Sequence, residues 1–398
     1  MDNLRFSMPA LANKSYFNYG GQGPLPEPSL NAIISSWEKI QELGPFTNQV
    51  WPYVTKEVEL TRNKLANLCG VNKHQIALTE NVTSGCILPI WGLPLSAGER
   101  ILISDCEHPG VVSACKELAR RKNLEIDILP VQTLRHGIDN QDKNTTELLR
   151  ALDVALKEET RLVVLSHLLW NTGVIMPIVE VAEKLSSHAC RPFLLVDAAQ
   201  SFGQIPIQDA ASKADIYAFT SHKWACGPEG LGGVAISQRV IENAHPTLVG
   251  WKSLKNEGSI YDHEANPFHA DARRFEIATS CVPLLAGLRC SLELLEKEGD
   301  VMERLKRINQ MSARLWEKLR AIDGIDLVLA GRPSTGLVSF STATKYSSYE
   351  LVKKLGDKGL WIRVLEDPEW LRACIHITTT AEEIDNLAES LKTLINRI

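Results

Sequence analysis

Apolar runs of strand length recur along the first two thirds of the chain, and longer stretches that mix apolar and polar positions separate them. The runs lie at 75–78, 100–104, 124–129, 160–167, 194–197 and 217–220. We expect helices from Ser29, through 58–65, from Cys86, through 148–152 and over 178–187. This alternation predicts an α/β domain with a large, doubly wound and mostly parallel sheet over residues 16 to 260.

The last third of the chain has a different pattern. It predicts two long helices, then strands and a final helix, at 282–299, 301–322, 335–340, 371–376 and from Ala381. A smaller α+β domain is therefore expected at the C-terminal end. We assign residues 261–398 to it, together with residues 1–15, which we expect to pack against it.

The stretch between residues 243 and 270 is polar and irregular. It contains His245, His263 and His269 at a spacing that matches no metal-binding motif. We expect a surface loop there and no metal site.

The composition excludes several classes of protein. The 398 residues allow a large core and two domains, and the net charge of -5 shows no nucleic-acid-binding footprint. No apolar run reaches the length of a membrane span, and residues 1–5 lack the apolar core of a secretory signal. The nine cysteines have no C-x-x-C spacing, which argues against a disulfide framework and a zinc site. We expect a cytoplasmic enzyme with reduced thiols and without nucleic-acid or membrane partners.

Two apolar runs end in charged side chains that the predicted sheet would bring to one edge. Asp197 ends one run, and Lys223 follows the next. A salt bridge would explain an arbitrary pair, but Trp224 makes the surroundings of Lys223 apolar, and the glycine-dense turn at 227–233 lets backbone approach a bound group. An apolar environment lowers the pKa of a lysine and favours the neutral amine that bonds an aldehyde. Because Asp197 would hold a pyridine nitrogen in its protonated form, the pair predicts a site for pyridoxal 5′-phosphate (PLP).

The motifs around these residues, Asp-Ala-Ala-Gln at 197–200 and Thr-Ser-His-Lys at 220–223, resemble the class V aminotransferase and cysteine desulfurase family. The family consists of fold-type I PLP-dependent enzymes, so the resemblance implies the fold-type I PLP-dependent transferase fold. It implies that Lys223 is the catalytic lysine and that Asp197 contacts the ring nitrogen. It further implies that Gln200 binds the O3′ of the cofactor.

A turn with small hydroxyl residues joins the first predicted strand to the helix after it. The N–H groups and positive dipole of a helix start suit a phosphate, although Thr83 would serve equally as a helix N-cap. The family binds the cofactor phosphate at this turn, so the resemblance implies Val82 and Thr83 as ligands. It also implies Thr220 and His222 as phosphate ligands just before the lysine.

Three further residues match family positions around the ring and the substrate. His108 follows the strand at 100–104 in a Glu-His pair, and the family stacks this imidazole on the pyridoxal ring. Asn171, which could be a plain turn residue, matches an asparagine near the O3′ and the substrate. Gly21, which could likewise lie in a simple turn, matches a glycine-rich segment on the substrate side of the site.

Arg372 matches the arginine with which family members bind the substrate α-carboxylate. A planar, two-pronged donor suits that task. Arg363 lies at the other end of the preceding loop and is expected to assist it. A solvated edge charge is the alternative for each residue.

The segment Arg-Phe-Glu-Ile-Ala-Thr at 274–279 resembles the family's Arg-Phe-Glu-x-Gly-Thr, with Ala278 in place of the usual glycine. In the family, this threonine reaches across a dimer interface to the partner's cofactor phosphate. The resemblance implies a homodimer with shared active sites. In it, Thr279 would bind cofactor, and Trp251 in the preceding loop would contact the substrate.

Cysteine desulfurases carry a nucleophilic cysteine on the loop before the carboxylate-binding arginine, but the loop at 363–371 has none. Cys374 lies past the arginine and is expected in the core. The chemistry left is β-elimination, in which the freed Lys223 amine removes the proton from the substrate Cα. The chain most resembles the cyanobacterial L-cysteine/L-cystine C–S lyases of this family. The resemblance implies that L-cystine or L-cysteine is converted to pyruvate, ammonia and cysteine persulfide or sulfide, with a sulfur-accepting protein of iron–sulfur cluster assembly as partner.

Several alternatives remain open at this point. A class V aminotransferase would need a keto acid, an epimerase of the isopenicillin N type shares a similar glycine-rich start, and a cysteine desulfurase would return alanine. A non-catalytic scaffold with this fold is disfavoured because Lys223 and Asp197 are both present.

Overall fold

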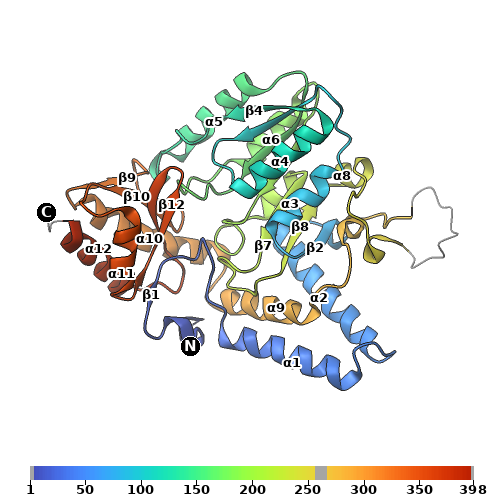
Figure 1. The fold of residues 1–398 in the computed structure, drawn as a ribbon, viewed down its shortest axis with the longest axis horizontal. Helices are drawn as coiled ribbons and strands as arrows, with labels where there is room; N and C mark the ends of the chain where they lie inside the picture. The colour runs from blue at the N-terminus through green and yellow to red at the C-terminus, as the bar shows by residue number, and fades with distance from the viewer. Residues whose placement is uncertain (1–3, 256–266, 396–398) are drawn as a thin grey trace.

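The structure is a computed structural model that describes residues 4–255 and 267–395 (Figure 1). The part of the predicted surface loop from 256 to 266, with His263, lies outside the described residues. Among the described residues, no helix is both long and apolar enough to cross a membrane.

The large sheet has seven strands within the described part of the chain, in the order β2-β8-β7-β6-β5-β3-β4. The strands are β2 (Ile76–Thr79), β3 (Arg100–Ser104), β4 (Glu125–Leu129), β5 (Thr160–Ser166), β6 (Phe193–Asp197), β7 (Ile216–Thr220) and β8 (Gly232–Ile236). Strand β8 pairs antiparallel with β2 and with β7, whereas the other neighbouring pairs are parallel. The predicted mostly parallel α/β sheet is therefore confirmed.

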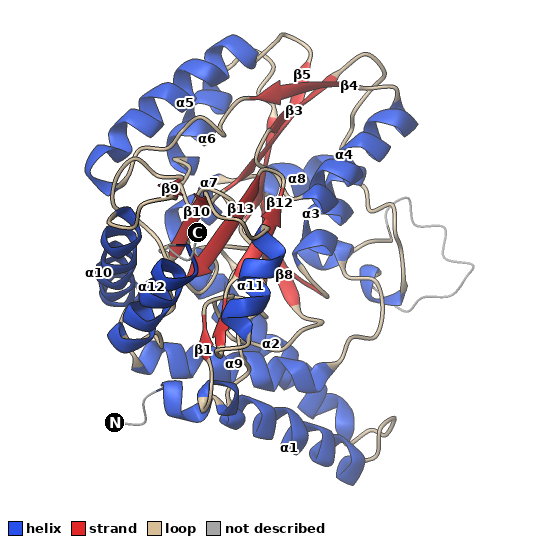
Figure 2. Cartoon of the chain, turned by 60° about the vertical axis from the view of Figure 1, so that its left-hand side comes forward, coloured by secondary structure: helices blue, strands red, loops and turns tan. Residues whose placement is uncertain are grey.

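Helices cover both faces of this sheet, because its central strands are apolar at successive positions. One face packs against α2 (Val50–Cys69), α5 (Gln141–Ala155), α6 (Ile178–Ser187) and α7 (Gln208–Lys213). The other packs against α3 (Val82–Trp91), α4 (Pro109–Lys122) and α8 (Gln238–Asn243). Neighbouring residues of β5 show the division, since Val163 belongs to the buried cluster that includes residues of α5 and α6, whereas Val164 belongs to the cluster that includes residues of α3 and α4. Figure 2 shows the helices around the strands of this layer.

Helices α1 (Glu27–Leu43) and α9 (Val282–Lys297) lie side by side along the large sheet domain (Figure 1). Their hydroxyls meet in a hydrogen bond of 2.8 Å between Ser29 Oγ and Ser291 Oγ. The close approach requires glycine at position 287, because a Cβ there would lie 2.5 Å from Ile33 Cγ1. The chain thus returns to the large domain before it enters the C-terminal one.

The C-terminal domain packs helices on a four-stranded antiparallel sheet of order β12-β13-β10-β9 within the described residues. Its elements are α10 (Val301–Arg320), β9 (Ile325–Leu327), β10 (Leu337–Thr342), α11 (Ser348–Gly356), β11 (Leu360–Trp361), β12 (Arg363–Glu366), β13 (Glu369–Cys374) and α12 (Ala381–Ile395). Its core contains Leu315, Phe340 and Leu387, and Phe17 joins them from the N-terminal segment. Next to Phe17, β1 (Ser15–Tyr16) pairs parallel with β11.

Candidate active site

The carboxyl ends of the parallel strands meet at one edge of the large sheet, where a cavity of about 680 Å³ lies between the sheet and the C-terminal domain. Most of the predicted site residues line it. They are Gly21, Val82, Thr83, His108, Asn171, Asp197, Gln200, His222, Lys223, Arg363 and Arg372. Segments that are distant in sequence therefore form one site.

Asp197 ends β6 and is buried at the floor of the cavity. Its Oδ1 accepts a hydrogen bond of 2.8 Å from the Ala199 backbone N–H. Burial raises the pKa of Asp197, while this hydrogen bond and the nearby Lys223 act in the opposite direction. A cationic ring nitrogen would supply a counter-charge to this buried carboxylate.

Lys223 lies in the turn after β7, beside the fully buried Trp224. Burial lowers the pKa of Lys223 to about 8, so about a tenth of its amine is neutral at pH 7 and about half at pH 8. No hydrogen bond or ion pair of its amine occurs among residues 4–255 and 267–395. Gly23 crosses this turn, where its N–H donates to the His222 carbonyl at 2.7 Å and a Cβ would collide with the Lys223 carbonyl oxygen. The amine is available for a covalent bond.

The predicted phosphate pocket combines a helix start with a polar turn. Val82 and Thr83 begin α3, whose N-cap Asn81 accepts a hydrogen bond of 2.9 Å from Ser84 N–H. His222 lines the cavity, and its Nδ1 lies 2.9 Å from Thr220 Oγ1. Thr220 itself does not line the cavity, and its hydroxyl contacts His222 instead.

His108 caps α4, and its Nδ1 accepts a hydrogen bond of 3.2 Å from Gly110 N–H. Partial burial lowers the pKa of His108, and the positive charge of Lys223 lowers it further. The imidazole is therefore neutral at pH 7, as stacking beside a cationic ring requires.

The amide of Gln200 is held at both ends. Its Oε1 accepts from Trp224 Nε1 at 2.8 Å, and its Nε2 donates to the Gly20 carbonyl at 2.9 Å. One N–H of this amide is left for a ligand. Asn171 is also oriented, since its Oδ1 accepts from Thr172 N–H at 2.8 Å and its Nδ2 lies 3.4 Å from Cys106 Sγ.

Arg372 lies in β13 with an exposed fraction of 1%. Its Nη1 donates to the Trp170 carbonyl at 2.6 Å, whereas its Nε has no hydrogen-bond partner in the described part of the chain. Gly20 leaves room beside it, because a Cβ there would lie 2.7 Å from Nη2. No carboxylate pairs with this buried guanidinium among the described residues, so it is suited to an anionic ligand. Arg363 is its cross-strand partner in β12 and is exposed in the cavity wall.

Besides Thr220, two predicted site residues lie outside the cavity of the single chain. Trp251 has an exposed fraction of 41%, and Thr279 is also exposed. They belong to adjoining segments, because Lys252 N–H donates to the Ile277 carbonyl at 3.2 Å. The protomer alone therefore does not bring them to the site.

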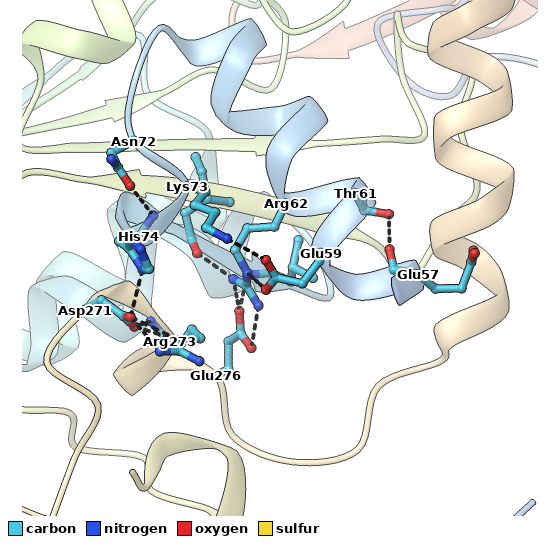
Figure 3. Close-up of polar contacts among 12 residues, drawn as sticks. Glu57, Glu59, Thr61, Arg62, Asn72, Lys73, His74, Asp271, Arg273 and Glu276 are labelled. Carbon is cyan, nitrogen blue, oxygen red and sulfur yellow. Dashed lines mark hydrogen bonds and ion pairs between the residues drawn. The ribbon is translucent and has the colours of Figure 1, made fainter. Parts of the chain in front are cut away.

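The Thr279 segment is anchored to the large domain through Glu276 (Figure 3). Glu276 Oε1 accepts hydrogen bonds from Arg62 Nη1 at 2.6 Å and from Leu78 N–H at 2.9 Å. The buried Arg62 also contacts Glu59, with 3.9 Å between Nε and Oε1. This network fixes the direction in which the chain continues toward Thr279.

The loop predicted before Arg372 is a hairpin. Arg363–Glu366 and Glu369–Cys374 form antiparallel strands in which Glu366 faces Glu369, so Asp367 and Pro368 alone connect them. The hydrophobic pattern does not predict β12, because charged residues stand at both of its ends.

Sequence reasoning missed several cavity residues, above all Glu107. This carboxyl is buried and accepts hydrogen bonds from Ser104 Oγ, Ser166 N–H and Ser166 Oγ at 2.5, 2.7 and 2.7 Å. Its position three residues after a buried strand and directly before His108 was the available signal. Cys106 and Trp170 also line the cavity.

The donor set fits PLP. It offers an unpaired lysine amine, a buried carboxylate for a cationic ring nitrogen, a neutral imidazole and a helix start for a phosphate. Arg372 is left over for the carboxylate of a second molecule.

Comparison with known proteins adds independent findings. A family model described as aminotransferase class-V matches residues 46–387. Two solved structures of C-DES are each 36% identical to the chain with a TM-score of 0.90. One is a complex of this cystine C–S lyase with its reaction product cysteine persulfide, over 97% of this chain and 99% of that one. The other is a mutant with glycine covalently linked to the PLP cofactor, over 98% and 99%.

Two curated relatives are more distant. Isopenicillin N epimerase from Streptomyces clavuligerus is 28% identical over 95% of this chain and 94% of its own length. A probable cysteine desulfurase from Methanothermobacter thermautotrophicus is 23% identical over 98% and 97%.

Proposed function

The chain belongs to the aminotransferase class-V family of fold-type I PLP-dependent enzymes, and on that premise we propose that it is a carbon–sulfur lyase that acts on L-cystine and L-cysteine. From cystine and water it would form pyruvate, ammonia and cysteine persulfide. From cysteine it would form sulfide in place of the persulfide. The products would supply sulfur to an acceptor protein of iron–sulfur cluster assembly.

One observation carries the choice of a lyase over a desulfurase: no available thiolate faces the substrate within the described residues. The hairpin tip at 366–369 has no cysteine. Cys106 lines the cavity, but burial raises the pKa of its thiol to about 12. Cys374 is fully buried and accepts a hydrogen bond of 3.3 Å from Gly20 N–H. A thiol protonated at pH 7 is a poor sulfur acceptor.

The protein groups have separable tasks. PLP, when bound, supplies an electron sink for the bonds to the substrate Cα. Lys223 would hold the cofactor, and its neutral amine would take the proton from the substrate Cα. Asp197 would hold the ring nitrogen in its protonated form, and Arg372 would bind the α-carboxylate and so orient the Cα–H bond. A sulfur group at Cβ then leaves as an anion, which a thiol of ordinary pKa about 8.5 does far more readily than an alcohol.

The hairpin tip supports cystine as the better substrate. Glu366 and Asp367 line the outer wall of the cavity and are exposed. Their negative charges attract the distal ammonium of cystine, a group that cysteine lacks. Persulfide is also a better leaving group than sulfide, so both effects act in one direction.

We also propose a homodimer with shared active sites. Leu248, Val249 and Trp251 expose apolar surface, with exposed fractions of 54%, 48% and 41%. They lie close to the Thr279 segment, and a two-fold dimer is the commonest way to cover such a surface. Within this assembly, Thr279 would contact the partner's cofactor phosphate and Trp251 the partner's substrate.

The test is pyruvate formation from cystine, cysteine, S-methylcysteine and serine without added keto acid. We expect pyruvate from cystine above all, and the same products from the Cys374→Ala variant. Alanine as the main product would indicate a desulfurase, and a requirement for a keto acid would indicate an aminotransferase.

The likeness to isopenicillin N epimerase favours a second candidate, epimerisation at Cα. It needs the same lysine and arginine but no leaving group at Cβ. Interconversion of D- and L-amino acids without pyruvate would support it against the lyase.

A further inference from the structure

Glu107 is a buried carboxyl that the proposed chemistry does not use. It lies three residues after the end of β3 and directly before the predicted stacking residue His108. Its side chain lines the cavity wall. Three donors from Ser104 and Ser166 fix both of its carboxyl oxygens. These hydrogen bonds fix the orientation of the Glu107 side chain and therefore the position of its carboxyl charge.

That place is next to Asp197. Ser166 and Asp197 are register partners at the carboxyl ends of the neighbouring parallel strands β5 and β6. Register partners point to the same face of a sheet. Because Glu107 binds both the N–H and the hydroxyl of Ser166, it lies beside the carboxylate that would hold the PLP ring nitrogen. Two carboxyls thus share one buried region.

The other titratable groups that face Glu107 carry no charge near neutral pH. They are the thiols of Cys86 on α3, Cys115 on α4 and Cys106 on its own segment. Burial raises the pKa of each thiol, to about 12 for Cys106 and Cys115. The neutral His108 follows it in sequence, so Asp197 is the charged group beside Glu107, and its charge raises the pKa of Glu107.

Burial raises the pKa of Glu107 to about 7, and the charge of Asp197 adds to the rise, while the two serines oppose it. Glu107 is therefore neutral below about pH 7 and negative above it. A serine hydroxyl can donate to the carboxylate or accept from the acid, so the serine cage suits both forms.

We propose that Glu107 is a positioning residue that acts through Asp197, where its negative charge strengthens the hold on the proton that Asp197 shares with the PLP ring nitrogen. A second negative charge nearby raises the proton affinity of the whole pair. The ring then stays protonated to higher pH than Asp197 alone would allow. The inference rests on PLP as the cofactor and holds for any substrate.

The test follows the ring proton directly. Apo protein is loaded with PLP that carries 15N in the ring, and the 15N chemical shift is measured from about pH 6 to about pH 10. The Glu107→Gln variant keeps the shape and most hydrogen bonds but removes the charge. We expect its ring nitrogen to lose the proton about one pH unit lower than in the wild-type protein, because a neighbouring charge shifts a pKa by at least this order.

Two further comparisons separate charge from structure. Glu107→Asp keeps the charge and should restore most of the wild-type titration. The dissociation constant of PLP should rise about tenfold in Glu107→Gln at about pH 8.5, with little difference at about pH 6, where Glu107 itself is neutral. A purely structural role would lower the melting temperature and leave the 15N titration unchanged.

Coincident 15N titrations of wild-type and Glu107→Gln protein would overturn the proposal, and so would an Asp variant that behaves like Gln. If Glu107→Gln does not fold, Ser166→Ala takes its place. Loss of this donor keeps Glu107 protonated to higher pH, so the ring nitrogen should again lose its proton at lower pH, and an unmoved curve would count against us.

Discussion

Replacement of Arg372 by glutamine should weaken substrate recognition while leaving the cofactor in place. The guanidinium is 1% exposed, its Nη1 is bound to the Trp170 carbonyl, and its Nε is free among the described residues. A carboxylate bound side-on would accept two charge-assisted hydrogen bonds, each worth about 1.5–3 kcal/mol. Their loss amounts to about 3–6 kcal/mol, or roughly a hundredfold to ten-thousandfold in kcat/KM.

The assay is kcat/KM for pyruvate release from cystine, with the visible absorbance of bound PLP as a check on loading. The spectral response to glycine measures carboxylate binding without turnover. Arg363→Gln is the matched control, because Arg363 faces Arg372 across the ladder but is exposed. An exposed charge contributes about 1 kcal/mol or less, so we expect a change of fivefold or so at most. A decrease below about tenfold for Arg372→Gln, or a larger effect of Arg363→Gln, would refute the assignment.

Three further predictions follow from other parts of the structure. Burial lowers the pKa of Lys223 to about 8, so covalent loading of apo protein with PLP should accelerate as pH rises through about 8, where the amine becomes neutral. The loading rate is measured by absorbance at each pH, and a rate that rises with a midpoint near the ordinary lysine pKa of about 10.5 would contradict this. Glu276→Ala removes the close carboxylate partner of the buried Arg62 and leaves Glu59, at 3.9 Å, as its remaining carboxylate neighbour among the described residues, so it should lower the free energy of unfolding in urea by about 3–5 kcal/mol. Glu42→Ala at an exposed pair should lower it by less than about 1 kcal/mol. Mixed Lys223→Ala and Thr279→Ala chains should form hybrid sites of altered PLP affinity in equilibrium dialysis, and affinities equal to those of the separate variants would exclude shared sites.

The strands that the sequence predicts best are those buried on both faces. The run at 100–104 is reproduced as β3, and β6 and β7 differ from the prediction by one residue at the start. The hydrophobic pattern does not predict strand β8, because its first two residues are glycines. The second is required by packing, since a Cβ at Gly233 would lie 2.7 Å from the Phe219 ring. A glycine-rich turn and a glycine-rich strand look alike until their neighbour is known.

The candidate site divides in the same way. Lys223 and Asp197 could be predicted because they end apolar runs within recognisable motifs. For Glu107, the sequence indicates only a place near the sheet edge, because its partner Ser166 lies on another strand and is far away in sequence. Trp251 and Thr279 stay predictions for the opposite reason, since their motif implies a neighbouring chain.

The hairpin before Arg372 argues against a desulfurase in two ways: its tip has no cysteine, and its backbone is held in a strand pair. A desulfurase needs a thiolate within reach of the substrate sulfur. Here the two-residue turn at Asp367 and Pro368 closes a ladder whose register pairs Glu366 with Glu369 and Arg363 with Arg372. The tip is thus tied by backbone hydrogen bonds to the strand that carries Arg372. In the proposed reaction, sulfur would therefore leave the site on a small molecule, as the lyase requires.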